Sequence, residues 1–387
     1  MPAMSKGGGD KKFSGLELLR FLCAVTIVAW HYQNFFWLSG TANVAGYVRE
    51  AQPLYLPLYV AYNWGNYAVE VFWTISGFIF FWKYAEAVRS GRTDAREFFV
   101  LRFSRLYPLH FLTFLAVAVM QWVYTAGHEA PFIFGFNDLR HFALNLFLAS
   151  DWGFHKGLSF NGPVWSISVE ILAYTTFFLV ARRWRIGPRM LGGIIVALVL
   201  AKMAPVIKDI TLCHLYFFVG GAVHMAVARP GARPGRAALL WTVAAAVLIA
   251  INWRTDGKVH TFALLAVSLA LLFAFLALGN VVRGEKVRHA FGVLGNLTYS
   301  SYLLHFPLQL GTVIVMDRLG LDRAIFFSPW GLAAFMVGVF VVGQISFSLF
   351  EHPAQEWLRA RMRRPRLAVE AQASALVSAS NGSSTQA

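Results

Sequence analysis

The feature that most limits what this chain can fold into is a series of apolar runs, each long enough to cross the hydrocarbon core of a membrane as a helix. Hydrophobic residues make up 57% of the 387 residues and charged residues only 14%, a balance that soluble globular domains do not show. The sequence therefore predicts an all-α protein, a polytopic integral membrane bundle of about ten transmembrane helices. The ten runs are 16–38, 67–84, 106–126, 163–181, 190–207, 210–228, 237–253, 259–280, 291–316 and 329–350.

Positive charge is spread over the short loops between these runs. The chain has 34 Lys and Arg against 19 Asp and Glu, and its net charge of +15 would suit nucleic acid only if it were gathered in one basic domain. With the N terminus inside, the cytoplasmic segments hold 25 of the 34 basic residues and the outer segments hold 9. The positive-inside rule then places both termini in the cytoplasm, and we expect no nucleic-acid partner.

A single domain is expected between the two ends of the chain. It spans 13–355, whereas 1–12 and 367–387 lack apolar periodicity and are predicted to be disordered. The two cysteines, Cys23 and Cys213, both lie inside apolar runs. This pattern supports neither a disulfide framework nor a thiolate metal site.

Two polar residues, Arg20 and His31, interrupt the first apolar run. Because no small-residue cleavage site closes this run, we interpret it as a retained helix and not as a secretory signal. Eleven helical residues correspond to about 20° of net rotation and roughly 16 Å of rise, so both side chains project from one face at different depths. Hydrocarbon tolerates neither group without a partner or a task, which makes the pair a candidate functional site.

Polar groups recur in other apolar runs, mostly in the middle or outer half of the bilayer on this topology. They are Glu70, Ser76, Ser166, Ser168, Glu170, Ser300, Ser301, Tyr302 and His305. A single Ser or His in a transmembrane helix usually bonds a neighbouring helix, and for each serine taken alone that structural role is the simpler interpretation. The carboxylates are harder to explain in this way.

Glu70 and Glu170 each lie a turn or two from the predicted outer surface, and His31 lies some fifteen residues above the inner end of its helix. We expect the three to converge as a base with its orienting acid. A carboxylate bonded to one imidazole nitrogen fixes the tautomer and leaves the other nitrogen free to take a proton from a hydroxyl. The structural alternative is a polar contact between helices.

The predicted inner surface carries a different signature. Arg102 and Arg105 are three residues apart, and so lie on one helical face, while Arg20 lies at the same depth. Guanidinium groups suit phosphate, which indicates a phosphate-rich cytosolic ligand. The alternative is ordinary positive-inside charge.

These residues occur in stretches that resemble the acyltransferase-3 family of membrane O-acyltransferases. The resemblance covers about 13 to 355 and rests on six stretches in the family's order. These are the Arg20-x10-His31 pair, VEVFWTISGF, the Arg102-x2-Arg105 pair followed by YPL, FNGPVWSISVE, YSSYLLHFP and FEHPA. Further site candidates within them are Trp165, Ser166, Ser168, Ser300, Tyr302, His305 and Glu351.

The resemblance implies a ten-helix acyltransferase core in the bacterial cytoplasmic membrane. It implies acyl-CoA as the cytosolic donor, with acetyl-CoA expected, and no permanently bound cofactor. The implied acceptor is a hydroxyl of a cell-surface glycan, a lipid-linked saccharide or a small natural product. In this family's pattern His31 is the catalytic histidine, Arg20 its essential partner, and Arg102 and Arg105 the pair that meets the nucleotide donor.

Two other functional classes have to be weighed against this one. Intramembrane carboxylates, histidines and arginines also build the ion pathways of transporters, but we find no repeat between 1–190 and 191–350 of the kind that transporters commonly show. A non-catalytic scaffold would leave the polar cluster without a purpose.

The mechanism also has two forms. Direct transfer with His31 as the base is the simpler, and a covalent acyl intermediate on Ser166, Ser168 or Ser300 competes with it. In either form we expect the donor to enter from the inner face, at the three arginines. The acceptor is expected to enter from the outer face, beside the two glutamates and the 127–162 loop, with the thioester near His31.

Overall fold

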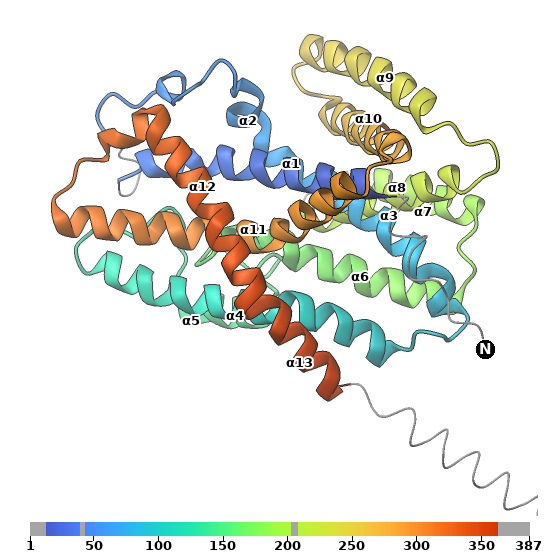
Figure 1. Cartoon of the computed structure of the whole chain (residues 1–387), viewed down its shortest axis with the longest axis horizontal. Helices are drawn as coiled ribbons and strands as arrows, with labels where there is room; N and C mark the ends of the chain where they lie inside the picture. The colour runs from blue at the N-terminus through green and yellow to red at the C-terminus, as the bar shows by residue number, and fades with distance from the viewer. Residues whose placement is uncertain (1–12, 39–42, 203–207, 363–387) are drawn as a thin grey trace, which may run out of the picture.

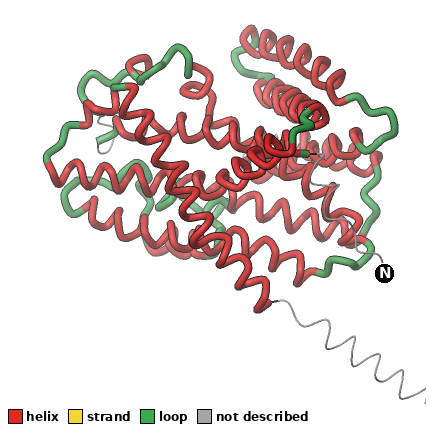
Figure 2. Tube along the Cα trace, in the orientation of Figure 1, coloured by secondary structure: helices red, strands yellow, loops and turns green. Residues whose placement is uncertain are grey.

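A computed structural model describes residues 13–38, 43–202 and 208–362 of the 387-residue chain. Within these ranges the chain is helical with short connections, and the β pairing in them is an isolated bridge between Trp37 and Asn43 (Figure 2). The segments 1–12 and 367–387, predicted to be disordered, lie outside the described residues.

Thirteen α-helices are labelled along the described part of the chain (Figure 1). Their bounds are α1 (Ser14–His31), α2 (Tyr59–Trp64), α3 (Ala68–Arg89), α4 (Ala95–Thr125), α5 (Leu139–Leu146), α6 (Trp165–Arg183), α7 (Pro188–Ala201), α8 (Lys208–Val227), α9 (Pro234–Arg254), α10 (His260–Val281), α11 (Glu285–Leu319), α12 (Pro329–Ser346) and α13 (His352–Met362). A 3-10 turn, η1 (Tyr32–Phe36), extends α1, and one turn of π-helix, η7 (Phe347–Glu351), joins α12 to α13.

Each of the ten predicted apolar runs has a helix in the structure. Seven helical segments of the described chain are long and apolar enough to span a membrane: Ser14–Phe36, Ala95–Thr125, Gly162–Arg183, Lys208–Val227, Pro234–Arg254, His260–Val281 and Pro329–Met362. The apolar helix α7 is shorter, and α3 and α11 carry the polar residues of the family stretches, which lower their hydropathy. The count of ten spans therefore stays a prediction.

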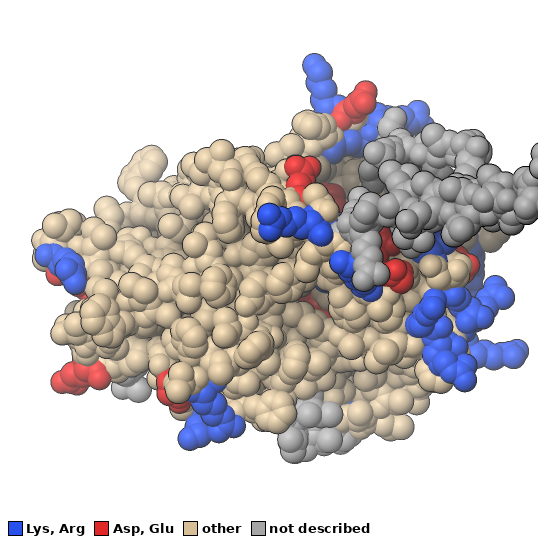
Figure 3. All heavy atoms as spheres, turned by 90° about the horizontal axis from the view of Figure 1, so that it is seen from below, with Lys and Arg blue, Asp and Glu red and all other residues tan. Residues whose placement is uncertain are grey.

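The helices form an elongated bundle in which α1 packs against α11, α10 and α3 (Figure 1). The start of α1 and the α3–α4 connection lie at one end of the bundle, and the α11–α12 connection lies at the other. Lys and Arg side chains gather at the end where α1 starts, on the right of Figure 3. This asymmetry is the one that the positive-inside rule uses, while the cytoplasmic location of the termini stays a prediction.

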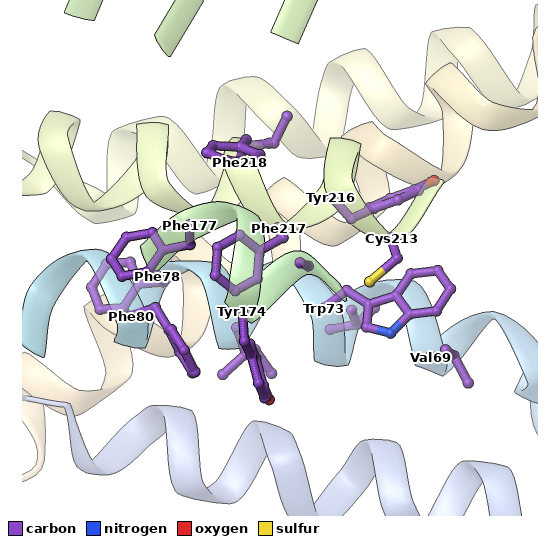
Figure 4. Close-up of a cluster of buried hydrophobic side chains, with 14 of the residues drawn as sticks. Val69, Trp73, Phe78, Phe80, Tyr174, Phe177, Cys213, Tyr216, Phe217 and Phe218 are labelled. Atoms are coloured by element: carbon purple, nitrogen blue, oxygen red, sulfur yellow. The ribbon is translucent and has the colours of Figure 1, made fainter. Parts of the chain in front are cut away.

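The closest helix packing joins α3 to α8. A Cβ atom built on Gly77 would lie 1.8 Å from the Phe217 carbonyl oxygen, and one on Gly220 would lie 1.9 Å from the Thr74 carbonyl oxygen. Small residues allow such backbone contact between helices in a membrane. Around them, aromatic side chains of α3, α6 and α8 interleave in a buried cluster (Figure 4).

A second aromatic cluster closes the opposite end of the bundle. Phe35 of η1 stacks on Phe326 with ring centroids 3.8 Å apart. Arg323 is buried there, donates to the Trp37 carbonyl at 2.6 Å and pairs with Asp317 at 2.9 Å. These contacts hold the segment after α1 in place, and with it the residues next to His31.

Candidate active site

Two cavities lie one behind the other in the bundle, and they share Val69 and Tyr302 in their walls. The inner cavity has a volume of about 140 Å³ and the outer one about 690 Å³. The polar residues that line the inner cavity are Arg20, Ser76, Arg102, Arg105, Ser166, Glu170, Tyr174, Thr298, Tyr299 and Tyr302. Those that line the outer cavity include His31, Gln33, Asn34, Arg49, Asn66, Asp151, His155, Asp209 and Tyr302.

Arg20 is fixed at the inner cavity by two partners. Its guanidinium donates to Glu17, one helical turn earlier in α1, at 2.8 Å and to the Thr298 hydroxyl of α11 at 3.0 Å. Gly295 makes room for this carboxylate, because a Cβ there would lie 1.9 Å from a Glu17 oxygen. Arg20 therefore enters the cavity wall already oriented by neighbouring helices.

Arg102 and Arg105 reach the same cavity from α4. Arg102 donates to the Tyr84 hydroxyl at 2.5 Å, and its guanidinium lies 5.0 Å from the Phe80 ring centroid and 4.9 Å from that of Tyr84. Its Nε is buried without a hydrogen-bond partner. A guanidinium supported by aromatic rings but only partly hydrogen-bonded is suited to an added anion.

Glu170 lies with these arginines and not with His31. It lines the inner cavity, where the hydroxyl groups of Ser76 and Tyr174 face its carboxylate. The expectation that it converges on His31 from the outer side is wrong. The physical reason is depth, because five residues of α6 separate it from Trp165, which lines the outer cavity, and five helical residues rise by about 7.5 Å.

Glu70 also differs from its expected position. It stands in the first turn of α3 and lines neither cavity, and its neighbouring charges are Lys208 and Asp209 at the start of α8. In the part of the chain that the structure describes, no carboxylate is paired with His31. The orienting acid that the sequence predicts is therefore not found beside the imidazole.

Amide groups and a second histidine surround His31 instead. The Asn34 side-chain amide lies 3.4 Å from Nδ1 of His31 and also donates to Gln309 at 3.3 Å. Gln309 in turn donates to the His31 carbonyl at 2.8 Å. The His305 ring of α11 lies with its centroid 4.7 Å from that of His31. The sequence analysis did not single out Asn34 or Gln309, although each is a polar residue within or beside an apolar run.

The candidate serines have structural partners. Ser166 lies 2.7 Å from the Tyr302 hydroxyl, Ser168 accepts from the Asp151 backbone N–H at 3.0 Å, and Ser300 donates to Glu351 at 2.5 Å. None of the three has a histidine within hydrogen-bond distance among the described contacts, as a serine nucleophile activated by a base requires. The geometry therefore favours direct transfer over an acyl-serine intermediate.

The remaining candidates lie in the walls and behind them. Trp165 lines the outer cavity and meets Trp73 edge to face, with ring centroids 5.8 Å apart. Glu351 is buried in η7 and also accepts from Gln355 at 3.0 Å. It thereby ties the junction of α12 and α13 to α11 and lines neither cavity.

The loop between α5 and α6 adds a carboxyl group that the sequence analysis missed. Asp151 is buried in the outer cavity wall, 3.3 Å from the His155 ring. Burial, with the charge of Asp209 nearby, raises the pKa of Asp151 to about 7, while burial lowers the pKa of His155. The contact between them is therefore not a permanent ion pair, and the carboxyl group is available to the cavity.

An anion site faces an imidazole across one shared wall, an arrangement that suits transfer of a group from a phosphate-bearing donor. The family described as an acyltransferase domain, acyltransferase-3, matches residues 13–348. The chain belongs to this family. It is also similar to the acyltransferase MdmB of Streptomyces mycarofaciens, at 27% identity over 333 residues that cover 77% of this chain and 82% of that protein. No solved structure matches the chain.

Family membership decides between the functional classes that the sequence left open. This protein is a membrane-embedded acyltransferase, not a transporter or a scaffold. The matched range includes both cavities' lining residues in α1, α3, α4, α6 and α11. Glu351 lies just beyond its end.

Proposed function

We propose that this acyltransferase moves a short acyl group, acetyl in the first instance, from acyl-CoA to a hydroxyl of a saccharide. What supports this proposal most is the pairing of the two cavities. Arg20, Arg102 and Arg105 line one, His31 lines the other, and Tyr302 stands in both walls. Phosphate-binding groups and a base thus reach one partition from opposite sides.

The inner cavity supports a short acyl group. Its volume of about 140 Å³ compares with the roughly 150 Å³ that holds one benzene molecule in a protein core. A nucleotide does not fit in this space, so the adenosine and its phosphates stay at the inner end of the arginine cluster. The pantetheine arm carries the thioester inward toward Tyr302.

The outer cavity supports a polyhydroxylated acceptor. Trp30, Trp37 and Trp165 contribute aromatic surface to it, and Asn34 and Asp151 contribute hydrogen-bonding groups. Aromatic faces with a few placed polar groups are the usual composition of a pocket for a small polar ligand. The 127–162 loop contributes Asp151 and thereby the side from which we expect the acceptor to enter.

In the proposed reaction His31 takes the proton of the acceptor hydroxyl as its oxygen attacks the thioester carbon. A C–O bond forms, the C–S bond breaks, and the proton on His31 passes to the leaving thiolate. The products are an ester and coenzyme A. No electron carrier or second reactant is required.

Purified protein in detergent, labelled acetyl-CoA and a panel of saccharide acceptors test the proposal, with ester formation followed by mass spectrometry. We expect His31→Ala to lower the transfer rate about a hundredfold or more. His289→Ala, an exposed histidine of the first turns of α11, is the matched control and keeps the parental rate. Near-parental transfer by His31→Ala would exclude His31 as the base.

Cells with and without the gene identify the acceptor. Mass spectrometry of their surface glycans and lipid-linked saccharides should show one acyl ester that depends on the gene. The same fractions serve as acceptors for the purified enzyme. If no saccharide fraction accepts the acyl group while a non-carbohydrate alcohol does, the acceptor class that we propose is wrong.

A further inference from the structure

His305 has one nitrogen committed and one left open. It is fully buried in α11, and its Nδ1 lies 2.6 Å from the Tyr302 backbone carbonyl. Because a carbonyl oxygen only accepts, Nδ1 carries the proton and Nε2 holds the lone pair. In the described part of the chain this Nε2 is buried without a hydrogen-bond partner. An open acceptor of this kind is costly and calls for an explanation.

His31 is fixed in the complementary tautomer. Gln309 donates its amide N–H to the His31 carbonyl, so the oxygen of Gln309 is the atom that faces Asn34. Asn34 then donates one N–H to that oxygen and directs the other at Nδ1 of His31. Nδ1 is therefore the acceptor in His31, and Nε2 carries the proton.

The two rings bring an N–H donor and an open lone pair into contact. Their centroids are 4.7 Å apart, and the planes are inclined by 42°. We propose that His305 is the positioning residue of His31: its Nε2 accepts a hydrogen bond from the His31 Nε2–H and leaves Nδ1 as the base. This inference rests on the proposed function, and it replaces the carboxylate that the sequence predicts with a second imidazole.

This pairing fits the steps of the transfer. The acceptor hydroxyl takes the place of the Asn34 N–H at Nδ1, a contact that is long at 3.4 Å and lies in the outer cavity wall. The hydroxyl proton moves to Nδ1, the C–O bond forms and the C–S bond breaks, and the same proton then passes to the thiolate. Throughout, the Nε2–H stays with His31, and His305 stabilises the transient imidazolium by accepting from it.

A neutral partner is also the one that this location favours. His305 is completely buried, and a carboxylate placed there would lose its hydration without a counter-charge among its described contacts. An imidazole accepts the same hydrogen bond without carrying a charge in the resting enzyme. The carboxylate Glu170 is instead held at the inner cavity, near the arginines.

Two substitutions of His305 separate this role from a purely structural one. The amide of Asn reaches the position of Nδ1 and keeps a donor for the Tyr302 carbonyl, whereas the amide of Gln reaches the position of Nε2 and keeps an acceptor for His31. We expect His305→Asn to lower kcat about tenfold to a hundredfold and His305→Gln to retain a kcat at least about tenfold higher than His305→Asn. The KM values for donor and acceptor should change little in either variant.

A structural role predicts the reverse order, because the 2.6 Å contact with Tyr302 survives only in His305→Asn. Equal kcat values in the two variants, or a higher kcat in His305→Asn, would overturn the inference. The matched control is His110, another fully buried histidine with one nitrogen on a backbone carbonyl, that of Asn145 at 2.8 Å, and the other unpaired. His110→Asn and His110→Gln should not differ in kcat per folded molecule.

Two further measurements keep the test decisive. If either His305 variant does not accumulate, His305→Ala with added imidazole replaces it: a restored kcat supports the inference, and no restoration contradicts it. His31→Ala is assayed in parallel. An active His31→Ala refutes the proposed base, whereas an inactive His31→Ala together with a reversed Asn and Gln order refutes only the role of His305.

Discussion

Replacing Arg102 by alanine tests whether the inner cavity binds the phosphates of the donor. The Arg102 guanidinium is held by Tyr84 and by two aromatic rings, and its Nε is buried without a partner. A hydrogen bond from a charged donor contributes about 1.5–3 kcal/mol. We therefore expect Arg102→Ala to weaken coenzyme A binding about tenfold to 150-fold. Arg102→Lys keeps the charge but not the planar fork and should recover only part of this affinity.

The assay is binding of coenzyme A to purified protein in detergent. Arg96→Ala is the matched control, because Arg96 is an exposed arginine in the first turn of the same helix and lines neither cavity. Pantetheine, which lacks the phosphates, is the ligand control, and its affinity should be the same in parent and variant. Unchanged coenzyme A affinity in both Arg102→Ala and Arg105→Ala would assign these arginines to membrane topology alone.

Three other outcomes follow from the packing, the loop and the charge distribution. Gly77→Ala should lower stability by about 1–3 kcal/mol, measured as thermal unfolding in detergent, because α3 and α8 have to separate around a Cβ placed 1.8 Å from the Phe217 oxygen. Gly192→Ala, with nothing within 4 Å, should not destabilise the protein. Asp151→Asn should raise the unfolding temperature over the parent more at pH 8 than at pH 5. With its pKa raised to about 7, the folded carboxyl group resists an ionisation that the unfolded chain undergoes near pH 4, so its contribution to stability falls between these values. A reporter at the C terminus should report cytoplasm, and a periplasmic signal from a correctly inserted fusion would refute the topology.

The helices and the arginine cluster could be predicted because they depend on local spacing. Apolar runs fix where helices form, and the i, i+3 spacing of Arg102 and Arg105 puts both at one cavity. The eleven-residue interval from Arg20 to His31 likewise predicts one face at two depths, and the structure places Arg20 at the inner cavity and His31 at the outer one. Each of these statements concerns a single helix.

The partners of His31 could not be predicted in this way. Which groups meet across helices depends on how each helix is rotated and tilted, and no spacing within one helix contains that information. Counting residues placed both glutamates near the outer surface, but α6 carries Glu170 to the arginines and the start of α3 places Glu70 beside α8. Asn34 and Gln309 lie beside His31 because α11 packs along α1.

Tyr302 connects the features that the two cavities share. Its hydroxyl donates to the Pro163 carbonyl at 2.7 Å, so the hydroxyl of Ser166 is the donor in their own contact, and its carbonyl fixes the tautomer of His305. Pro307 leaves the Leu303 carbonyl without its helical partner, and Asn161, at the end of the 127–162 loop, donates to it at 3.0 Å.

The loop that brings Asp151 to the outer cavity is therefore bonded to the same turn of α11 that carries His305. That turn also holds the wall between the cavities, because Tyr302 stands in both. A ligand that moves this loop consequently acts on the partition and on His305 together. Several polar residues of the family stretches thus have a task without touching substrate: Ser166 and Tyr302 hold the partition in place, and Asn161 joins the acceptor side to it.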